Sequence, residues 1–130
     1  MCVDFRYLNK AYPKDDFPLP HIDVIVDSAT SSAMYSFMDG FSRYNKIMMA
    51  VMDKIKTVFI TEWGTYCYKV IPFGLKNAGA TNQRAATALF HDMMHKKVEV
   101  YVDDMMVKSK MREGYFEALD KFLTRLEKYN

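Results

Sequence analysis

The segment VEVYVDDMMVKSK, residues 98–110, restricts the possible folds of this chain more than any other part of the sequence. Three valines alternate with Glu99 and Tyr101, and apolar residues resume after the adjacent pair Asp103 and Asp104. This alternation predicts a strand, a tight turn and a second strand, with both aspartates at or beside the tip of a hairpin. Aspartate is also a good turn residue, because its side chain can accept hydrogen bonds from nearby backbone amides. On its own the pair is therefore equally consistent with a solvent-exposed turn.

Composition limits the class of protein. The 130 residues, 50% hydrophobic and 15% aromatic, suffice for one domain with its own core and are too few for two. A net charge of +2 does not indicate a polyanionic partner, so any nucleic-acid site must come from local clustering. Cys2 and Cys67 match neither a disulfide framework nor a zinc site, which favours buried thiols in an intracellular protein. No membrane span, membrane partner or targeting signal is expected.

The rest of the chain is expected to mix strands and helices. We predict an extended segment over 1–8, a proline-rich loop over 9–20, a strand over 33–39, a hairpin from 56–61 and 65–71, and helices over 77–97 and 112–129. Residues 21–29 suit a helix or a strand, and Pro20 near the first turn favours the helix. The apolar stripes expected to face the core are Ala85, Leu89 and Met93 in the first long helix, and Phe116, Leu119, Phe122, Leu123 and Leu126 in the last.

A third carboxylate could join the pair at the hairpin. Asp39 ends the strand predicted over 33–39 and lies 64 residues before Asp103, so only the fold can bring the two together. Two carboxylates ~4 Å apart repel by about 4 kcal/mol at an effective dielectric near 20, so three at one place require a cation. Hard oxygen ligands select Mg²⁺ or Mn²⁺, and a pair of such ions suits phosphoryl transfer. The sequence therefore predicts a divalent-metal site for phosphoryl transfer.

Five ordered blocks carry a resemblance to a known family: MCVDFRYLNK, FPLPHID, SFMDGFSRYNKI, TEWGTYCYKVIPFGLKNAGATNQR and YVDDMMVKSK. Together they resemble the reverse transcriptase core of gypsy-type long-terminal-repeat retrotransposons and cover nearly the whole chain. The resemblance implies an α+β fold, namely a palm with an antiparallel sheet backed by helices and part of the fingers, truncated at both ends. Fingers elements are expected at about 1–32 and 53–75, and palm elements at about 33–52 and 76–130.

The resemblance also implies the site. Asp39 and Asp103 would bind both of two Mg²⁺ (or Mn²⁺) ions, Asp104 would complete the catalytic acidic cluster, and the Gly40 carbonyl would add a metal ligand. The chemistry implied is RNA-directed DNA synthesis by transfer of a nucleotide from a dNTP to a primer 3′-OH.

Further residues would contact substrates. Tyr44 falls at the family's sugar-selecting position, where a ring packed under the ribose leaves no room for a 2′-hydroxyl. Phe73 and Gly74 would lie near the dNTP and the templating base, and Arg6 and Tyr101 are expected to contact nucleic acid. Scattered basic residues could meet phosphates or simply form a solvated face: Lys10, Lys14, Arg43, Lys46 and Arg84.

The partners implied are an RNA or DNA template with its primer, a dNTP, and the rest of a retrotransposon polyprotein, with its thumb, connection and ribonuclease H. The chain is expected to be a fragment of that polyprotein, inactive in isolation, and located in a cytoplasmic virus-like particle.

Two departures from the family pattern suggest drift: Arg43 replaces a glycine, and Asn82 replaces an aromatic and so removes an apolar contact beneath the site.

Two other functions stay open. A non-enzymatic nucleic-acid-binding module would show a glycine-aromatic strand signature, which no strand here contains. An inert retroelement relic would ignore divalent ions.

Overall fold

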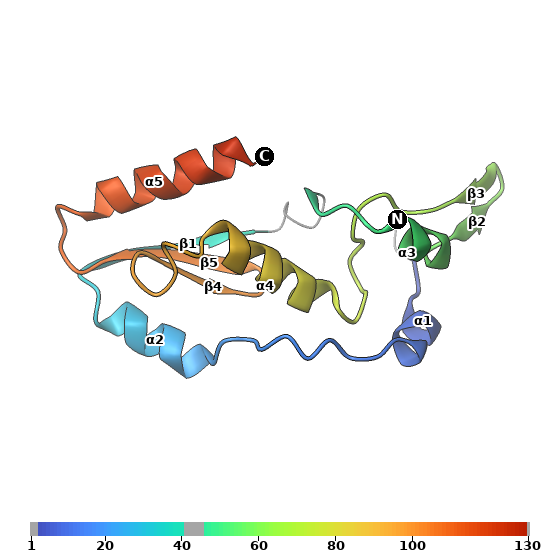
Figure 1. Ribbon diagram of the computed structural model, residues 1–130, viewed down its shortest axis with the longest axis horizontal. Coiled ribbons are helices and arrows are strands. Elements are labelled where there is room, and N and C mark those ends of the chain that lie inside the picture. The colour runs from blue at the N-terminus through green and yellow to red at the C-terminus, as the bar shows by residue number, and fades with distance from the viewer. Residues whose placement is uncertain (1–2, 41–45, 130) are drawn as a thin grey trace.

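The computed structural model describes residues 3–40 and 46–129, so the predictions for Cys2, Arg43 and Tyr44 lie outside the described residues. Ten elements follow one another in the described chain: α1 (Arg6–Ala11), α2 (Ile22–Thr30), β1 (Met34–Asp39), α3 (Val51–Lys56), β2 (Phe59–Thr61), β3 (Gly64–Tyr66), α4 (Ala78–Leu89), β4 (Val98–Tyr101), β5 (Asp104–Ser109) and α5 (Tyr115–Lys128). Figure 1 shows an elongated molecule with a helix-covered sheet at one end and α1, α3 and the β2–β3 hairpin at the other.

An antiparallel sheet of order β1-β5-β4 forms the centre of the larger end. β4 and β5 are joined only by Val102 and Asp103, so the predicted hairpin is confirmed. The strand predicted over 33–39 is β1, and it pairs with β5 rather than with a sequence neighbour. The long connection from β1 to β4 therefore leaves the sheet and returns to it.

Helices cover both faces of this sheet (Figure 1). α4 and α5 pack on one face, where the main core includes the stacked rings of Phe90 and Phe122, whose centroids are 4.9 Å apart. α2 packs on the other face through Ile25 and Ala29 against Met106 of β5. α2 confirms the helix favoured over residues 21–29.

The predicted apolar stripes of the two long helices are confirmed in part, because Leu89, Met93, Leu119, Phe122 and Leu126 lie in the main core or pack against it. α4 ends at Leu89, well short of residue 97, and Ala85 is exposed, whereas Ala78, Asn82, Gln83 and Ala86 are buried. In α5 the buried residues are Tyr115, Ala118 and Phe122, while Phe116 is 71% exposed and Leu123 43% exposed. Hydrophobicity alone misses part of the buried face of α4, because its buried side chains Asn82 and Gln83 are polar and hydrogen-bonded.

The smaller end also differs from expectation. The extended segment predicted over 1–8 contains the start of α1, and the Asp4 carboxylate accepts a 2.9 Å hydrogen bond from the Arg6 amide at the helix start. The two strands predicted over 56–61 and 65–71 shorten to the three-residue strands β2 and β3. Cys67, expected to be buried, is exposed.

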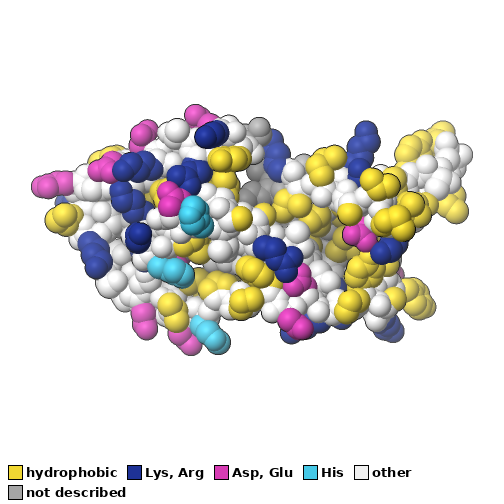
Figure 2. All heavy atoms as spheres, viewed as in Figure 1, with side chains coloured by type: hydrophobic (Ala, Val, Ile, Leu, Met, Phe, Trp, Pro, Cys, Tyr) yellow, Lys and Arg dark blue, Asp and Glu magenta, His cyan; other side chains and the backbone are white. Residues whose placement is uncertain are grey.

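Apolar side chains are abundant on the surface of this end (Figure 2). Ile60 is 83% exposed and Trp63 80% exposed on or beside the β2–β3 hairpin, and Met52 of α3 is 70% exposed. The smaller end therefore exposes several large apolar side chains to solvent.

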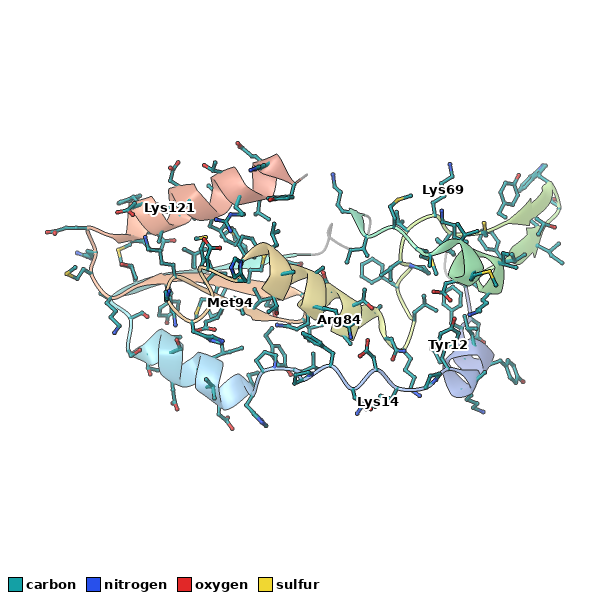
Figure 3. The ribbon with its side chains drawn as sticks, in the orientation of Figure 1. Tyr12, Lys14, Lys69, Arg84, Met94 and Lys121 are labelled. Carbon is teal, nitrogen blue, oxygen red and sulfur yellow. The ribbon has the colours of Figure 1, made fainter. Side chains whose placement is uncertain are left out.

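Arg84 of α4 ties the chain between α1 and α2 to the larger end (Figure 3). Its guanidinium lies 2.9 Å from the Asp15 carboxylate and stacks over Phe17, 4.8 Å from the ring centroid. Within the described part of the chain, no helix is long and apolar enough to cross a membrane.

Candidate active site

The hairpin turn and the end of β1 bring three carboxylate-bearing residues to one end of the sheet. Asp39, the last residue of β1, is paired in register with Asp104, the first residue of β5. The backbone amide of the buried Gly40 donates a 2.7 Å hydrogen bond to the carbonyl of Asp103. The backbone therefore places Asp39, Gly40, Asp103 and Asp104 beside one another.

The turn itself depends on an unusual residue. Val102, the first of the two loop residues, has φ 51°, in the left-handed region. Two-residue hairpin loops need a positive φ at this position to match the twist of the strands, but a β-branched residue adopts it at a cost. Neighbouring groups must therefore hold Val102 in place.

Gln83 of α4 supplies that support. Its Oε1 accepts a 2.7 Å hydrogen bond from the amide of Val102, and its Nε2 donates a 3.0 Å hydrogen bond to the carbonyl of Val100. Gln83 is only 2% exposed, so both bonds are shielded from water. One side chain thus fixes the backbone on both sides of Tyr101.

Asn82, the preceding residue of α4, contacts the turn as well. Its Nδ2 donates to the carbonyl of Val102 at 3.2 Å and to Oδ1 of Asp103 at 3.1 Å. The side chain is fully buried, and its Oδ1 is a buried acceptor with no partner among the described residues. From the sequence, we expect Asn82 only to lose an apolar contact. The structure shows that it instead donates two hydrogen bonds, one of them to Asp103, a predicted metal ligand.

Close packing lets α4 reach the turn. A Cβ at Gly79 would lie 3.2 Å from Cγ1 of Val102, tighter than most contacts of this kind. The helix therefore meets the loop through a residue without a side chain, one turn before Asn82 and Gln83. Hydrophobic periodicity does not identify either polar residue as part of the site.

The donor set suits a hard divalent cation, because it consists of carboxylate oxygens and a nearby backbone carbonyl. Asp39 and Asp104 are exposed and Asp103 is half-buried. In the arrangement described, over residues 3–40 and 46–129, no three His, Cys, Asp or Glu side chains converge closely enough to hold a metal ion. The ligand chemistry and the backbone placement fit Mg²⁺ or Mn²⁺, provided that the side chains of Asp39 and Asp104 turn toward the Asp103 carboxylate.

The other predicted site residues are distributed over both ends of the molecule. Tyr101 ends β4 opposite Asp104 and packs beside Ile25, Ala29 and Met106. Phe73, which is 49% exposed, precedes Gly74, whose φ is 94° and whose carbonyl accepts a 2.7 Å hydrogen bond from Asn9.

Arg6 lies in α1, its guanidinium 2.7 Å from the Asp4 carboxylate. This contact lowers the pKa of Asp4 below its usual value, chiefly through the hydrogen bond from the Arg6 side chain. The pKa of Arg6 is raised by the same bond, so the guanidinium stays charged. Arg6 is therefore a fixed positive charge, partly balanced by its neighbour.

A cavity of about 350 Å³ adjoins the hairpin on the face covered by α2. Tyr35, Phe37 and Tyr101 contribute aromatic walls, and Asp104 lies at the same cavity. A cavity with aromatic walls therefore adjoins the end of the sheet that carries the three aspartates.

Comparison with known proteins identifies the family. A family model described as reverse transcriptase (RNA-dependent DNA polymerase) matches residues 1–130. An RNA-directed DNA polymerase homolog of Oenothera berteroana is 33% identical over 107 residues, which are 82% of this chain and 75% of that protein. The Pol polyprotein of the Drosophila melanogaster transposon opus is 34% identical over 130 residues, all of this chain and 13% of the polyprotein.

Solved structures show the same fold. The protease-reverse transcriptase of prototype foamy virus superimposes with a TM-score of 0.84 at 21% identity, covering 97% of this chain and 17% of that one. The foamy viral enzyme solved in complex with an RNA/DNA hybrid matches with a TM-score of 0.81 at 20% identity, covering 95% of this chain and 16% of that one. The α+β fold with an antiparallel sheet backed by helices is therefore that of a reverse transcriptase, and this chain belongs to the reverse transcriptase (RNA-dependent DNA polymerase) family.

Proposed function

We propose that this chain forms the acidic centre of an RNA-directed DNA polymerase, with Asp39, Asp103 and Asp104 as its metal-binding catalytic residues. The observation that supports this most directly is the pairing of Asp39 with Asp104 and the bond from Gly40 to Asp103 at one sheet end, within a reverse transcriptase fold. No sequence-local constraint brings Asp39 to Asp103 and Asp104, so the pairing of β1 with β5 assembles the acidic group.

The reaction is a nucleotidyl transfer. The primer 3′-oxygen forms a bond to the α-phosphorus of a dNTP, the bond from that phosphorus to the β-phosphate oxygen breaks, pyrophosphate leaves, and the hydroxyl proton passes to solvent. Two bound Mg²⁺ or Mn²⁺ ions would supply stabilisation of the attacking and leaving oxygens. The role of Asp39, Asp103 and Asp104 is to hold those ions, with the Gly40 carbonyl as a further oxygen donor.

Substrate contacts are assigned by the family pattern. Tyr44 would exclude the 2′-hydroxyl of a ribonucleotide, and Phe73 and Gly74 would lie against the dNTP and the templating base. Arg6 and Tyr101 would contact the template or the primer. In this assignment, fingers elements occupy about 1–32 and 53–75, and palm elements about 33–52 and 76–130.

The chain spans about an eighth of the length of its polyprotein relatives, 12% of that of the Drosophila gypsy transposon and 13% of that of opus. Foamy viral neighbours are described in complex with double-stranded DNA and with an RNA/DNA hybrid. We propose that a template with its primer is the partner here too, and that thumb, connection and ribonuclease H segments of a polyprotein in a cytoplasmic particle complete the enzyme. The 130 residues alone are then expected not to extend a primer.

Manganese binding tests the site in the chain itself. We would titrate the 130-residue chain with Mn²⁺, following free Mn²⁺ by electron paramagnetic resonance and the melting temperature in parallel. Bound ion relieves carboxylate repulsion only in the native arrangement, so it should raise the melting temperature, and Asp103→Asn should lose most of that rise. Equal shifts in both proteins would show that the ion binds elsewhere and would overturn the assignment.

Primer extension by a longer polypeptide that contains the chain tests the reaction. Extension that requires Mg²⁺ or Mn²⁺ and disappears in Asp103→Asn supports the polymerase. A nucleic-acid-binding module would instead bind a primer-template without any need for the ion, and an inert relic would bind neither ion nor nucleic acid.

A further inference from the structure

We propose that Asn82 is a positioning residue that holds the Asp103 carboxylate ready for a divalent ion. This inference rests on the proposed function, because it assigns a role toward the same metal site. Its evidence is separate: it comes from α4, which lies outside the acidic group.

The first observation is the geometry of one amide group. Nδ2 of Asn82 lies 3.1 Å from Oδ1 of Asp103 and 3.2 Å from the carbonyl of Val102. A single NH₂ group can donate both of its hydrogens, so it can link the turn backbone to the carboxylate of the next residue. The side chain of Asp103 is thereby tied to the part of the backbone that Gln83 also fixes.

The second observation is what the amide leaves unpaired. Oδ1 of Asn82 is buried and has no hydrogen-bond partner within the described residues. Turning the amide over would place this oxygen against two other acceptors, the Val102 carbonyl and Asp103 Oδ1, so the orientation with Nδ2 toward the turn is the one the contacts select. A buried acceptor without a partner destabilises a fold. Asn82 thus contributes its contact to Asp103 at the expense of one unsatisfied atom.

The consequence concerns ion affinity. An uncharged amide donor fixes the orientation of a carboxylate without adding a cation that would repel the metal. A carboxylate already restrained in this way loses less side-chain freedom when the ion binds. Partners of metal ligands typically change metal affinity by about 10–100-fold when they are removed.

Asn82→Leu is the decisive variant, because leucine has the same number of side-chain heavy atoms and the same branching without either polar atom. We expect its dissociation constant for Mn²⁺, measured by electron paramagnetic resonance on the 130-residue chain, to rise about tenfold. Without the ion its melting temperature should stay within a few degrees of the wild-type value, because the variant loses two hydrogen bonds but also the orphaned acceptor. A role in stability alone would move the melting temperature and leave the dissociation constant unchanged.

Thr81→Val is the matched control. Thr81 lies beside Asn82 in α4, and its hydroxyl donates a 3.0 Å hydrogen bond to the carbonyl of Asn77, at the start of the helix rather than at the turn. The control should bind Mn²⁺ like the wild type. If leucine is too large for the site and Asn82→Leu fails to fold, Asn82→Ser is smaller, cannot reach Asp103, and should show the same weakened binding.

The outcomes separate the two proposals. Mn²⁺ binding by Asn82→Leu, or by the folded Asn82→Ser, that equals the wild-type value would overturn the role of Asn82. Wild-type binding that is insensitive to Asp103→Asn would instead overturn the metal site on which that role depends. Weakened binding in Thr81→Val would show that the effect belongs to α4 in general, and would also overturn a specific role for Asn82.

Discussion

Replacing Gln83 with leucine removes the side chain that supports the strained turn. The variant removes the hydrogen bonds that Gln83 makes to two backbone groups, the amide of Val102 and the carbonyl of Val100. An unpaired buried group costs about 1–3 kcal/mol, and the half-buried Val102 can recover part of that from water. We therefore expect Gln83→Leu to lower the free energy of unfolding by roughly 2–4 kcal/mol.

Urea unfolding of the 130-residue chain, followed by circular dichroism, measures this change. The midpoint should fall with little change in the slope, and the melting temperature should fall by roughly 10 °C for a domain of this size. Thr81→Val serves as the control on the same helix and should lose less than about 0.5 kcal/mol, as exposed or intrahelical changes usually do. A loss below about 0.5 kcal/mol in Gln83→Leu would refute the argument that this side chain holds the turn.

Three further predictions concern other parts of the chain. A hydrogen bond from Arg125 lowers the pKa of Asp92 from 3.8 to about 2, so the pair stabilises the fold fully above about pH 4 and loses this effect as the pH falls toward 2. The difference in melting temperature between the wild type and Asp92→Asn should accordingly shrink between pH 4 and pH 2, and a constant difference would contradict the pairing. Lys108→Met leaves the buried Glu99 carboxylate without the ammonium 2.7 Å away and should cost about 3–5 kcal/mol in urea unfolding, most of it recovered when Glu99→Leu is added. An unrecovered loss in the double variant would show that the charges are not the cause. In a complete polymerase that contains this chain, Tyr44→Ala should raise ribonucleotide incorporation relative to deoxynucleotide incorporation in primer extension, and unchanged discrimination would remove Tyr44 from the sugar pocket.

The hairpin that carries Asp103 and Asp104 could be predicted from the sequence because its signals are local, whereas the approach of Asp39 depends on the long-range pairing of β1 with β5. Alternation with period two marks β4 and β5, and a turn of two residues leaves little choice of register. The helix favoured over 21–29 could also be predicted from the sequence, because Pro20 lies just before α2. The sequence pattern is sufficient to predict a segment whose neighbours in sequence are also its neighbours in space.

The contribution of α4 could not be predicted in this way. Asn82 and Gln83 are polar and yet buried, because the loop at Val102 presents backbone groups that need partners. These backbone groups need partners because Val102 has a positive φ. A valine rarely adopts such a φ, so the sequence does not predict this turn geometry. Similarly, α1 begins where the Arg6 amide donates a hydrogen bond to the Asp4 carboxylate, and hydrophobic periodicity does not predict this contact.

The position of β5 between β4 and β1 has a consequence for folding. β4 and β5 close a loop of two residues, whereas the pairing of β1 with β5 closes the much longer loop between Asp39 and Asp104. Loop-closure entropy favours the local hairpin, so we expect Asp103 and Asp104 to be in place before Asp39, with folding φ-values near zero in β1 and higher in the hairpin. Until β1 docks, the outer edge of β5 offers unpaired amides and carbonyls to any passing strand. Partly folded molecules should therefore associate through β5, and such association would block the very edge on which the acidic group is completed.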